Sequence, residues 1–436
     1  PTSGPASQDW SIPHNVRDLL RARLASAGET GWQLLTTAAV IGRSFDYNTL
    51  REASGRSEVE TVAGLEALLA QGLVKEQAAG SEAAGERGSE ISYDFSHDKL
   101  RALVLEETSR TRQRLLHLRV AEALAGQLHP PREGWARAGQ IARHYHLSDQ
   151  DPLAAEYFKL AGEHAQSVYA NVDAMAFFQE ALAAGHPQAA KLHEDIGDLH
   201  ILAGEYSAAL NRYQTASALA EAQALPGLEH KLGMVHHRRG ELDLAVSYFQ
   251  SALEALGESG EAGPRARLYA DWSRTSHRQG QPRQAWELAG RAVELAEQAE
   301  DAAAQGQAHN ILGILARNAQ DWDQACAHLE RSLSVARASG DMGMQAAALN
   351  NLALVYGDRG EPEQAIQFAQ TALELCARQG DRHREAALHN NLADLYHAAG
   401  QAEQAMSHLK KAVVIFAEIG GEAGQMQSET WMLTEW

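Results

Sequence analysis

Residues 350–365 read NNLALVYGDRGEPEQA, and forty residues later, at 390–405, the chain reads NNLADLYHAAGQAEQA. The same order of large and small residues returns at earlier steps of forty. A fixed period of this length is typical of a chain built from stacked copies of one small unit, each of which buries its apolar side only against its neighbours. This repeat decides the fold, and the rest of the chain is interpreted from it.

Four columns of residues define the unit. A large side chain that packs between helices is followed by small side chains, which let neighbouring backbones approach closely. The large column is Leu232, Trp272, Leu312, Leu352 and Leu392; the small columns are Gly233, Ser273, Gly313, Ala353 and Ala393, then Ala245, Ala285, Ala325, Ala365 and Ala405, then Ala252, Ala292, Ser332, Ala372 and Ala412.

Turn residues divide each unit into two helices. Glycine stands at 240, 280, 360 and 400, where a helix C-terminus favours it, and Gln320 takes this place in one unit. Pro282 and Pro362 follow two residues after a glycine, in the first turn of the next helix, where proline is accepted. The pattern predicts a helix that ends near Gly360 and a second helix from about Pro362 to Gln379.

Shorter spacings extend the pattern backwards, with units around Ala209 and Ala174 and a looser pair at 136–147 and 152–162. Across residues 155–420 the columns resemble the tetratricopeptide repeat (TPR) family. The period of forty and the paired asparagines resemble its long-repeat branch, found in kinesin light chains and bacterial peptide-sensing regulators. The resemblance implies a mainly α fold, with a right-handed α-α superhelix of about seven TPR units over residues 126–420.

Residues 11–125 have a different rhythm. Apolar helices are predicted around 16–24, 32–41, 49–53 and 59–69, and short strands at 72–74 and 91–95. The Gly-, Ala- and Glu-rich stretch 78–90 between the strands is expected to be a mobile hairpin tip. Three helices followed by a β-hairpin is the order of a winged-helix-like domain. Residues 1–10 are expected to be a flexible leader, and the start at Pro1 suggests a cut inside a longer protein.

Three phrases of this domain, LLRARL at 19–24, AAVIGRSF at 38–45 and YDFSHD at 93–98, resemble the winged-helix segment of STAND proteins, which are signal-transduction ATPases with numerous domains. In that family the segment follows an ATPase domain and precedes a repeat sensor. The resemblance implies a missing N-terminal ATPase domain in cis, with ATP or ADP as its cofactor. No cofactor is expected in this fragment.

His97 matches a histidine that contacts the ADP diphosphate in several STAND proteins, and an imidazole N–H can donate to phosphate. The alternative is a histidine that satisfies the start of the next helix, with Asp98 in its first turn. The same domain suggests DNA, but the third helix, 59–69, has two glutamates and no basic residue, so direct nucleic-acid binding is not expected.

The concave face of a TPR superhelix is lined by the first helix of each unit. There the middle repeats carry basic residues and the last repeats carry asparagine. The predicted ligand- or peptide-binding residues are Asn310, Asn350, Asn351, Asn390, Asn391, Lys231, Arg238, Arg274, Arg278 and Arg317.

Asparagine in a helix interior costs roughly 0.5 kcal/mol relative to alanine, so its repetition suggests a purpose. One hypothesis is that Asn351 and Asn391 clamp a peptide backbone while Arg274, Arg278 and Arg317 attract an acidic group. The alternatives are that the amides bond between neighbouring repeats, or that duplicated repeats simply share residues.

Several kinds of chemistry are absent from the sequence. It has no GxxxxGK[ST], HExxH or GxSxG pattern, so the fragment is not expected to be an enzyme. The two cysteines, Cys326 and Cys376, lack the spacing of metal ligands. No apolar run is long enough for a membrane helix. A cytoplasmic location is expected. No metal site is predicted. Residues 126–436 hold 24 basic and 40 acidic residues, from totals of 38 and 57 less the 14 and 17 in residues 1–125, which disfavours nucleic-acid binding there.

The segment 421–436 carries Trp431, Met432, Leu433 and Trp436, and is predicted to be a capping helix over the last repeat or a docking tail. For the whole chain, the leading interpretation is the ligand- or protein-sensing TPR arm of a STAND-type regulator, with a peptide or protein partner in its groove and ligand-dependent oligomerisation as one output. The alternatives are a constitutive scaffold for protein assembly and a sensor of a small molecule such as a sugar.

Overall fold

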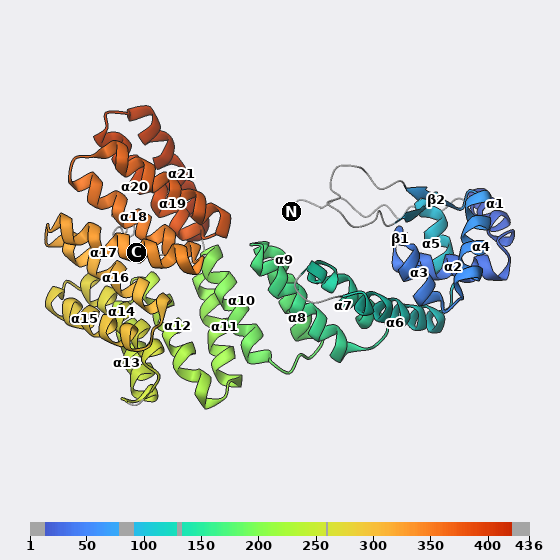
Figure 1. Cartoon of the computed structure of the whole chain (residues 1–436), viewed down its shortest axis with the longest axis horizontal. Helices are drawn as coiled ribbons and strands as arrows, with labels where there is room; N and C mark the ends of the chain where they lie inside the picture. Colours follow the sequence, from blue (N-terminus) through green and yellow to red (C-terminus); the bar gives the residue numbers. More distant parts are fainter. Residues whose placement is uncertain (1–13, 78–90, 129–132, 259, 421–436) are drawn as a thin grey trace, which may run out of the picture. The chain divides into compact units, whose positions relative to one another are not determined.

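The computed structural model describes residues 14–77, 91–128, 133–258 and 260–420 (Figure 1). The chain divides into two compact units. Unit 1 contains residues 1–167 and 176–186, and unit 2 contains residues 168–175 and 187–436. Within the described ranges, no helix is both long enough and apolar enough to cross a membrane.

Unit 1 begins with helices around a small antiparallel sheet whose strand order is β1-β3-β2. The four helices predicted around 16–24, 32–41, 49–53 and 59–69 are confirmed by α1 to α4. The elements are α1 (His14–Ala25), α2 (Gly28–Ile41), β1 (Ser44–Asp46), α3 (Tyr47–Ser54), α4 (Glu58–Ala70), β2 (Val74–Gln77) and β3 (Ser92–Phe95).

The strands differ in part from the sequence prediction. Strand β2 begins at Val74, because Gly72 has a left-handed φ of 65° and still belongs to the turn after α4. The prediction missed β1, because its three residues, with Phe45 buried between two polar residues, are too few for an alternation to be recognised. Phe45 packs on Tyr93 and Phe95, with ring centroids 5.8 and 6.0 Å away. The predicted hairpin tip, 78–90, lies outside the described residues.

Unit 1 continues with a run of helices. The looser helix pair predicted at 136–147 and 152–162 is confirmed by α7 and α8. The elements are α5 (Asp98–Glu107), α6 (Arg110–Gly126), the 3-10 helix η1 (Glu133–Arg137), α7 (Ala138–Leu147) and α8 (Asp151–Ser167), and α9 (Asn171–Ala183) contains residues of both units.

Unit 2 is a stack of helical hairpins (Figure 1). We call the first helix of each hairpin its A helix and the second its B helix. The hairpins are α10 (Ala189–Ala203) with α11 (Tyr206–Leu219), α12 (Leu225–Arg238) with α13 (Leu242–Leu256), α14 (Ala262–Arg278) with α15 (Pro282–Gln298), α16 (Ala302–Asn318) with α17 (Trp322–Ser339), α18 (Met342–Asp358) with α19 (Pro362–Gln379), and α20 (Arg382–Ala398) with α21 (Ala402–Gly420); the 3-10 helix η2 (Ala222–Ala224) precedes α12.

The turns inside these hairpins follow the predicted glycines. Gly240 and Gly360 have left-handed φ angles of 80° and 79°. Gln320, which replaces glycine, is held at φ 59°, a conformation that disfavours a residue with a Cβ atom. The predicted second helix from Pro362 to Gln379 is α19 with the same bounds.

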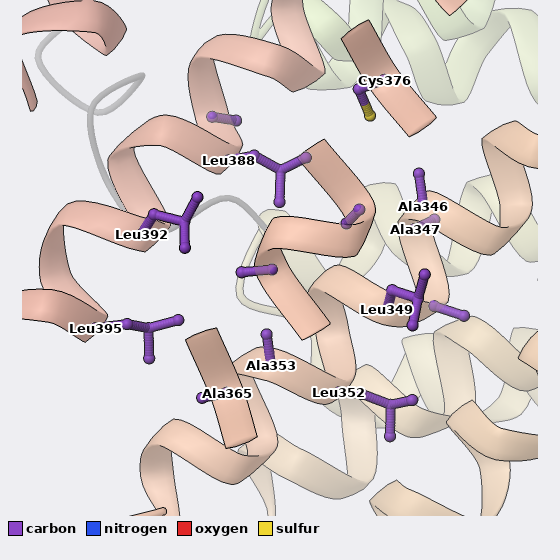
Figure 2. Close-up of a cluster of buried hydrophobic side chains, with 14 of the residues drawn as sticks. Ala346, Ala347, Leu349, Leu352, Ala353, Ala365, Cys376, Leu388, Leu392 and Leu395 are labelled. Carbon is purple, nitrogen blue, oxygen red and sulfur yellow. The ribbon is translucent and has the colours of Figure 1, made fainter. Parts of the chain in front are cut away.

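The repeat columns form the core of unit 2. Leu352 and Leu392 are 1% and 0% exposed, and Ala353 and Ala365 are fully buried beside them (Figure 2). Because these contacts join each hairpin to the next, the apolar surface of a unit is buried by its neighbours rather than within the unit alone.

The last B helix of the described residues, α21, is followed by no further described hairpin. On α19, Ile366 and Ala369 are buried, at 7% and 0% exposed. The equivalent side chains of α21, Met406 and Leu409, are 52% and 39% exposed. The predicted capping segment 421–436 lies outside the described residues, and its role stays a prediction. The exposed apolar side of α21 is the surface that such a cap would cover.

Close helix packing makes a pair of glycine substitutions informative. A Cβ atom on Gly233 of α12 would lie 2.5 Å from Phe249 Cε1 and 3.2 Å from the Ala245 carbonyl oxygen, whereas one on Gly290 of α15 would meet nothing within 4 Å. We predict that Gly233→Ala lowers the unfolding free energy by about 1–3 kcal/mol. Gly290→Ala should raise it by up to about 1 kcal/mol through helix propensity. Urea unfolding of both variants measures this, and equal effects would contradict the packing.

Candidate functional site

Polar side chains of the A helices contact one another across neighbouring repeats. Asn351 Nδ2 donates to Asn310 Oδ1 over 3.0 Å, and Arg317 Nε lies 2.6 Å from Asp358 Oδ2. Both contacts join residues 41 apart, one more than the repeat period of forty. Each side chain therefore contacts a residue that is adjacent in sequence to its own equivalent in the neighbouring unit. We call these contacts the polar ladder. Its other described members with this separation are His230–Asp271, Arg278–His237, Asn318–His277, Arg384–Gly343 and Asn391–Asn350.

The asparagines of the predicted peptide clamp bond to one another within this ladder. Asn391 Nδ2 donates to Asn350 Oδ1 over 2.8 Å, and Asn350 Nδ2 donates to Asn351 Oδ1 over 3.2 Å. Asn350, Asn351 and Asn391 are at most 1% exposed. This arrangement is the one expected from the alternative, in which the amides bond between repeats. A peptide would reach them only after the ladder opened, so the clamp stays a prediction.

The predicted basic residues are paired with carboxylates and carbonyls of unit 2. Lys231 Nζ lies 2.6 Å from Glu194 Oε1 and 2.7 Å from Asp198 Oδ2. Arg274 Nη2 lies 2.8 Å from Asp271 Oδ1, and Arg278 Nη1 donates to the His237 carbonyl over 2.9 Å. Lys231 and Arg278 therefore bind neighbouring repeats, whereas Arg274 pairs with a carboxylate of its own helix, α14.

Arg238 makes a contact of much longer range. Its Nη2 lies 3.8 Å from Oδ2 of Asp381, the residue before α20, and the two side chains are 16% and 3% exposed. Asp381 also caps α20 by accepting from Arg384 N over 3.1 Å. The Tyr206 ring packs edge-on against His383, with centroids 5.8 Å apart. The starts of α11 and α20 and the end of α12 thus lie together in unit 2.

Sequence reasoning did not identify the residues at the start of α20. The segment 381–384 reads DRHR, whereas the equivalent segments 341–344 and 301–304 read DMGM and DAAA. This departure from the repeat was a signal, because charge appears at a position where other units carry small or apolar residues.

Burial and positive charge set the electrostatics here. Burial, followed by the charge of Arg238, lowers the pKa of His383 from its ordinary 6.5 to about 4. The pKa of His237 is lowered well below its ordinary value, first by burial and then by Arg274, Arg278 and Arg238. Burial alone would lower the pKa of Arg238, but Asp381 and Tyr206 raise it overall. Both imidazoles are therefore neutral at pH 7.

His97 lies in unit 1 at the N-terminal boundary of α5. Its imidazole is exposed and makes no capping hydrogen bond to that helix, and Asp98 is in the first turn. His97 therefore occupies the N-cap position of α5, as the alternative of a helix-capping histidine requires, but its side chain does not form the capping hydrogen bond. Its predicted contact with a nucleotide stays a prediction.

Histidines meet in pairs that the sequence did not predict. His309 and His328 Nδ1 atoms are 3.1 Å apart, and those of His389 and His408 are 2.8 Å apart. Each pair joins the A and B helices of one hairpin. In the described part of the chain, no group of three or more histidine, cysteine or acidic side chains is placed to hold a metal ion.

Comparison with known proteins supports the repeat architecture. Residues 344–418 match the tetratricopeptide repeat family model. The repeat fold of this family is typically non-catalytic. No curated protein sequence matches the chain.

Solved structures extend the likeness beyond these residues. A signal transduction ATPase with numerous domains from Pyrococcus horikoshii, which has a tetratricopeptide repeat sensor, matches 98% of this chain at 14% identity and a TM-score of 0.52. This chain covers 64% of that protein. The Rap conjugation gene regulator of plasmid pLS20, solved with the Phr* peptide, matches 91% of this chain and 98% of its own at 16% identity and a TM-score of 0.54.

A Rap protein complexed with competence and sporulation factor matches 72% of this chain and 94% of its own, at 14% identity and a TM-score of 0.52. At these identities the three likenesses establish a TPR-type helical repeat fold.

The ladder predicts a cost for removing one amide. In Asn391→Ala, Asn350 Oδ1 loses a donor while it stays buried, so we expect the unfolding free energy to fall by about 1–3 kcal/mol. Asn211 is an exposed residue of α11, and Asn211→Ala is expected to change stability by no more than roughly 0.5 kcal/mol. Urea unfolding followed by circular dichroism compares the two. A loss in Asn391→Ala no greater than in Asn211→Ala would contradict the ladder's contribution.

The lowered pKa of His383 predicts a pH dependence of stability. Between pH 6.5 and about 4 the unfolded chain binds a proton that the folded chain does not, so stability falls as pH falls. From pH 7 to pH 5 this histidine should account for a loss of about 2 kcal/mol. His383→Gln should lose less stability over the same interval by about that amount. Equal losses in the two proteins, measured by urea unfolding, would show that His383 is not buried as described.

Proposed function

We propose that this chain is the sensing arm of a STAND-type signalling protein, and that its repeat array binds a peptide or protein partner on the A-helix face of unit 2. The observation that carries the proposal is the polar ladder, which gathers charged and amide side chains of successive A helices on one face. Helical repeat proteins commonly use such extended faces for binding. The Rap structures, which contain a bound peptide or factor, lend support by analogy of fold.

The N-terminal part supports the same proposal. The order α2, β1, α3, α4, β2, β3, with strand order β1-β3-β2, supports the proposal that this part is a winged-helix-like domain. We propose that this winged-helix-like segment links the repeat array to an ATPase domain that binds ATP or ADP, and that the exposed His97 contacts that nucleotide. The Pyrococcus horikoshii protein, of which this chain covers 64%, is described as a signal transduction ATPase with numerous domains that has a tetratricopeptide repeat sensor, which supports the proposed link to an ATPase domain.

The basic residues of the A-helix face provide the test. The inner variant is Lys231→Gln, Arg278→Gln and Arg317→Gln together. The outer variant is Arg283→Gln, Arg331→Gln and Arg378→Gln, which removes the same charge from exposed positions of the B helices α15, α17 and α19. Each protein is used as bait in an extract of its own cells, and the captured partner is identified by mass spectrometry. Fluorescence anisotropy then measures the affinity of its binding segment.

We expect the inner variant to bind the partner segment at least tenfold more weakly, a loss of about 1.4 kcal/mol or more, and the outer variant to bind it almost unchanged. Circular dichroism establishes that the proteins are equally folded. Equal affinity in all three would place the site elsewhere and contradict the proposal. A partner bound with no effect on ATP hydrolysis by the longer protein would favour a constitutive scaffold over a sensor.

A further inference from the structure

Two arginines of unit 2 have buried N–H groups with no acceptor. Among the described residues, Nη1 of Arg238 and Nε of Arg274 have no hydrogen-bond partner, and the buried hydroxyl of Tyr206, which contributes to the raised pKa of Arg238, has none either. A buried donor without an acceptor costs about 1–3 kcal/mol, and more when it is charged. Such groups are uncommon in native proteins and call for an explanation.

The two guanidinium groups belong to one place. Arg274 Nη2 lies 3.3 Å from the sulfur of Met234, which stands one helical turn before Arg238 on the same side of α12. The side chains of Arg274 and Arg238 are 15% and 16% exposed. Arg384 also approaches Asp381, with Nε 3.6 Å from the Asp381 Oδ2 atom that Arg238 faces. We call Arg238, Arg274, Arg384, Asp271 and Asp381 the arginine cluster.

The two carboxylates of the cluster differ in how closely their oxygen atoms approach the basic side chains. Asp271 is held tightly, with Oδ1 2.8 Å from Arg274 Nη2 and Oδ2 2.8 Å from His230 Nε2. Asp381 is only loosely paired, because its contacts with Arg238 and Arg384 at 3.8 and 3.6 Å exceed hydrogen-bond length. Its other oxygen is used by the backbone N–H of Arg384. The Asp381 carboxylate is thus approached by two arginines and accepts a hydrogen bond from neither side chain.

Positive charge exceeds negative charge in the cluster. It has three arginines and two aspartates, Arg278 lies close enough to affect it, and the neighbouring His237 and His383 are neutral. The pKa of Arg274 is lowered, mainly by burial and against the effect of Asp271, with Arg384, Arg238 and Arg278 adding to the decrease. A water molecule would satisfy the N–H groups but not the charge, whereas an oxyanion would satisfy both.

We propose that the arginine cluster binds an oxyanion, a carboxylate or phosphate-type group, which accepts from Arg238 and Arg274 and ties the A helices α12 and α14 to the start of α20. Oxygen acceptors with a delocalised negative charge suit the guanidinium fork. The anion is either free in solution or carried on a peptide. This site does not depend on the proposed function, because a free anion would bind it without a partner protein.

The test uses the whole chain and two probes at constant ionic strength, which removes general screening effects. Inorganic phosphate represents a free anion, and a tetraglutamate peptide represents carboxylates on a peptide, with tetraglutamine as its neutral control. Calorimetric titration measures affinity, and thermal unfolding measures the stabilisation that a bound ligand produces.

Two pairs of variants test the assignment in opposite directions. Arg238→Gln should weaken binding at least tenfold, while Arg267→Gln, an α14 arginine paired with Asp301 outside the cluster, should not change it. Asp381→Asn removes the competing charge but can still cap α20, and should tighten binding at least threefold. Asp321→Asn, which alters the cap of α17 in the same way, should have no effect on affinity. A gain of affinity in Asp381→Asn is not explained by misfolding.

A saturable response to phosphate would support a free oxyanion, and a response to tetraglutamate but not to tetraglutamine would support one carried on a peptide. The proposal is overturned if neither probe gives saturable binding to the unaltered chain. It is also overturned if Arg238→Gln and Asp381→Asn bind with unchanged affinity. Either result can be obtained whether or not the inner triple variant loses its protein partner.

Discussion

The structure of unit 2 depends on one constraint: a helical hairpin with apolar residues on two sides is buried only when another hairpin lies against each side. Small residues such as Ala353 and Ala365 allow that approach, and Leu352 and Leu392 fill the space between the helices. The exposed Met406 and Leu409 of the last helix mark the place where this burial stops. The polar side chains of the A helices in unit 2 are held in position by this stack.

The polar ladder adds direction to the stack. Apolar contacts between alanines and leucines tolerate sliding, but a hydrogen bond between Asn351 and Asn310 has one geometry. Because ladder contacts recur at a separation of 41 residues, they fix how each A helix is rotated against the next. A face ordered in this way can present fixed charges to a partner with little loss of conformational entropy on binding.

The repeats were predictable because their chemistry is local and periodic. Gly360 and Pro362 define the end of one helix and the start of the next within three residues, and α19 has the predicted bounds. The pairing of Asn391 with Asn350 was left open, since the sequence shows which residues recur but not whether their side chains face a neighbour or a ligand. Strand β1 and the Arg238–Asp381 contact were missed, the first because three residues are too few to establish a pattern, and the second because it joins residues 143 apart.

The Arg238–Asp381 contact makes the array sensitive to its own length. A change of one whole hairpin between α12 and α20, such as loss of α16 with α17, would keep the columns of leucines and alanines in register, although it would remove ladder contacts such as Asn351–Asn310. The same change would carry Asp381 and Arg384 round the superhelical axis by one step and away from Arg238. The apolar columns therefore tolerate a change in the number of hairpins, whereas the Arg238–Asp381 contact requires the present number of hairpins between α12 and α20.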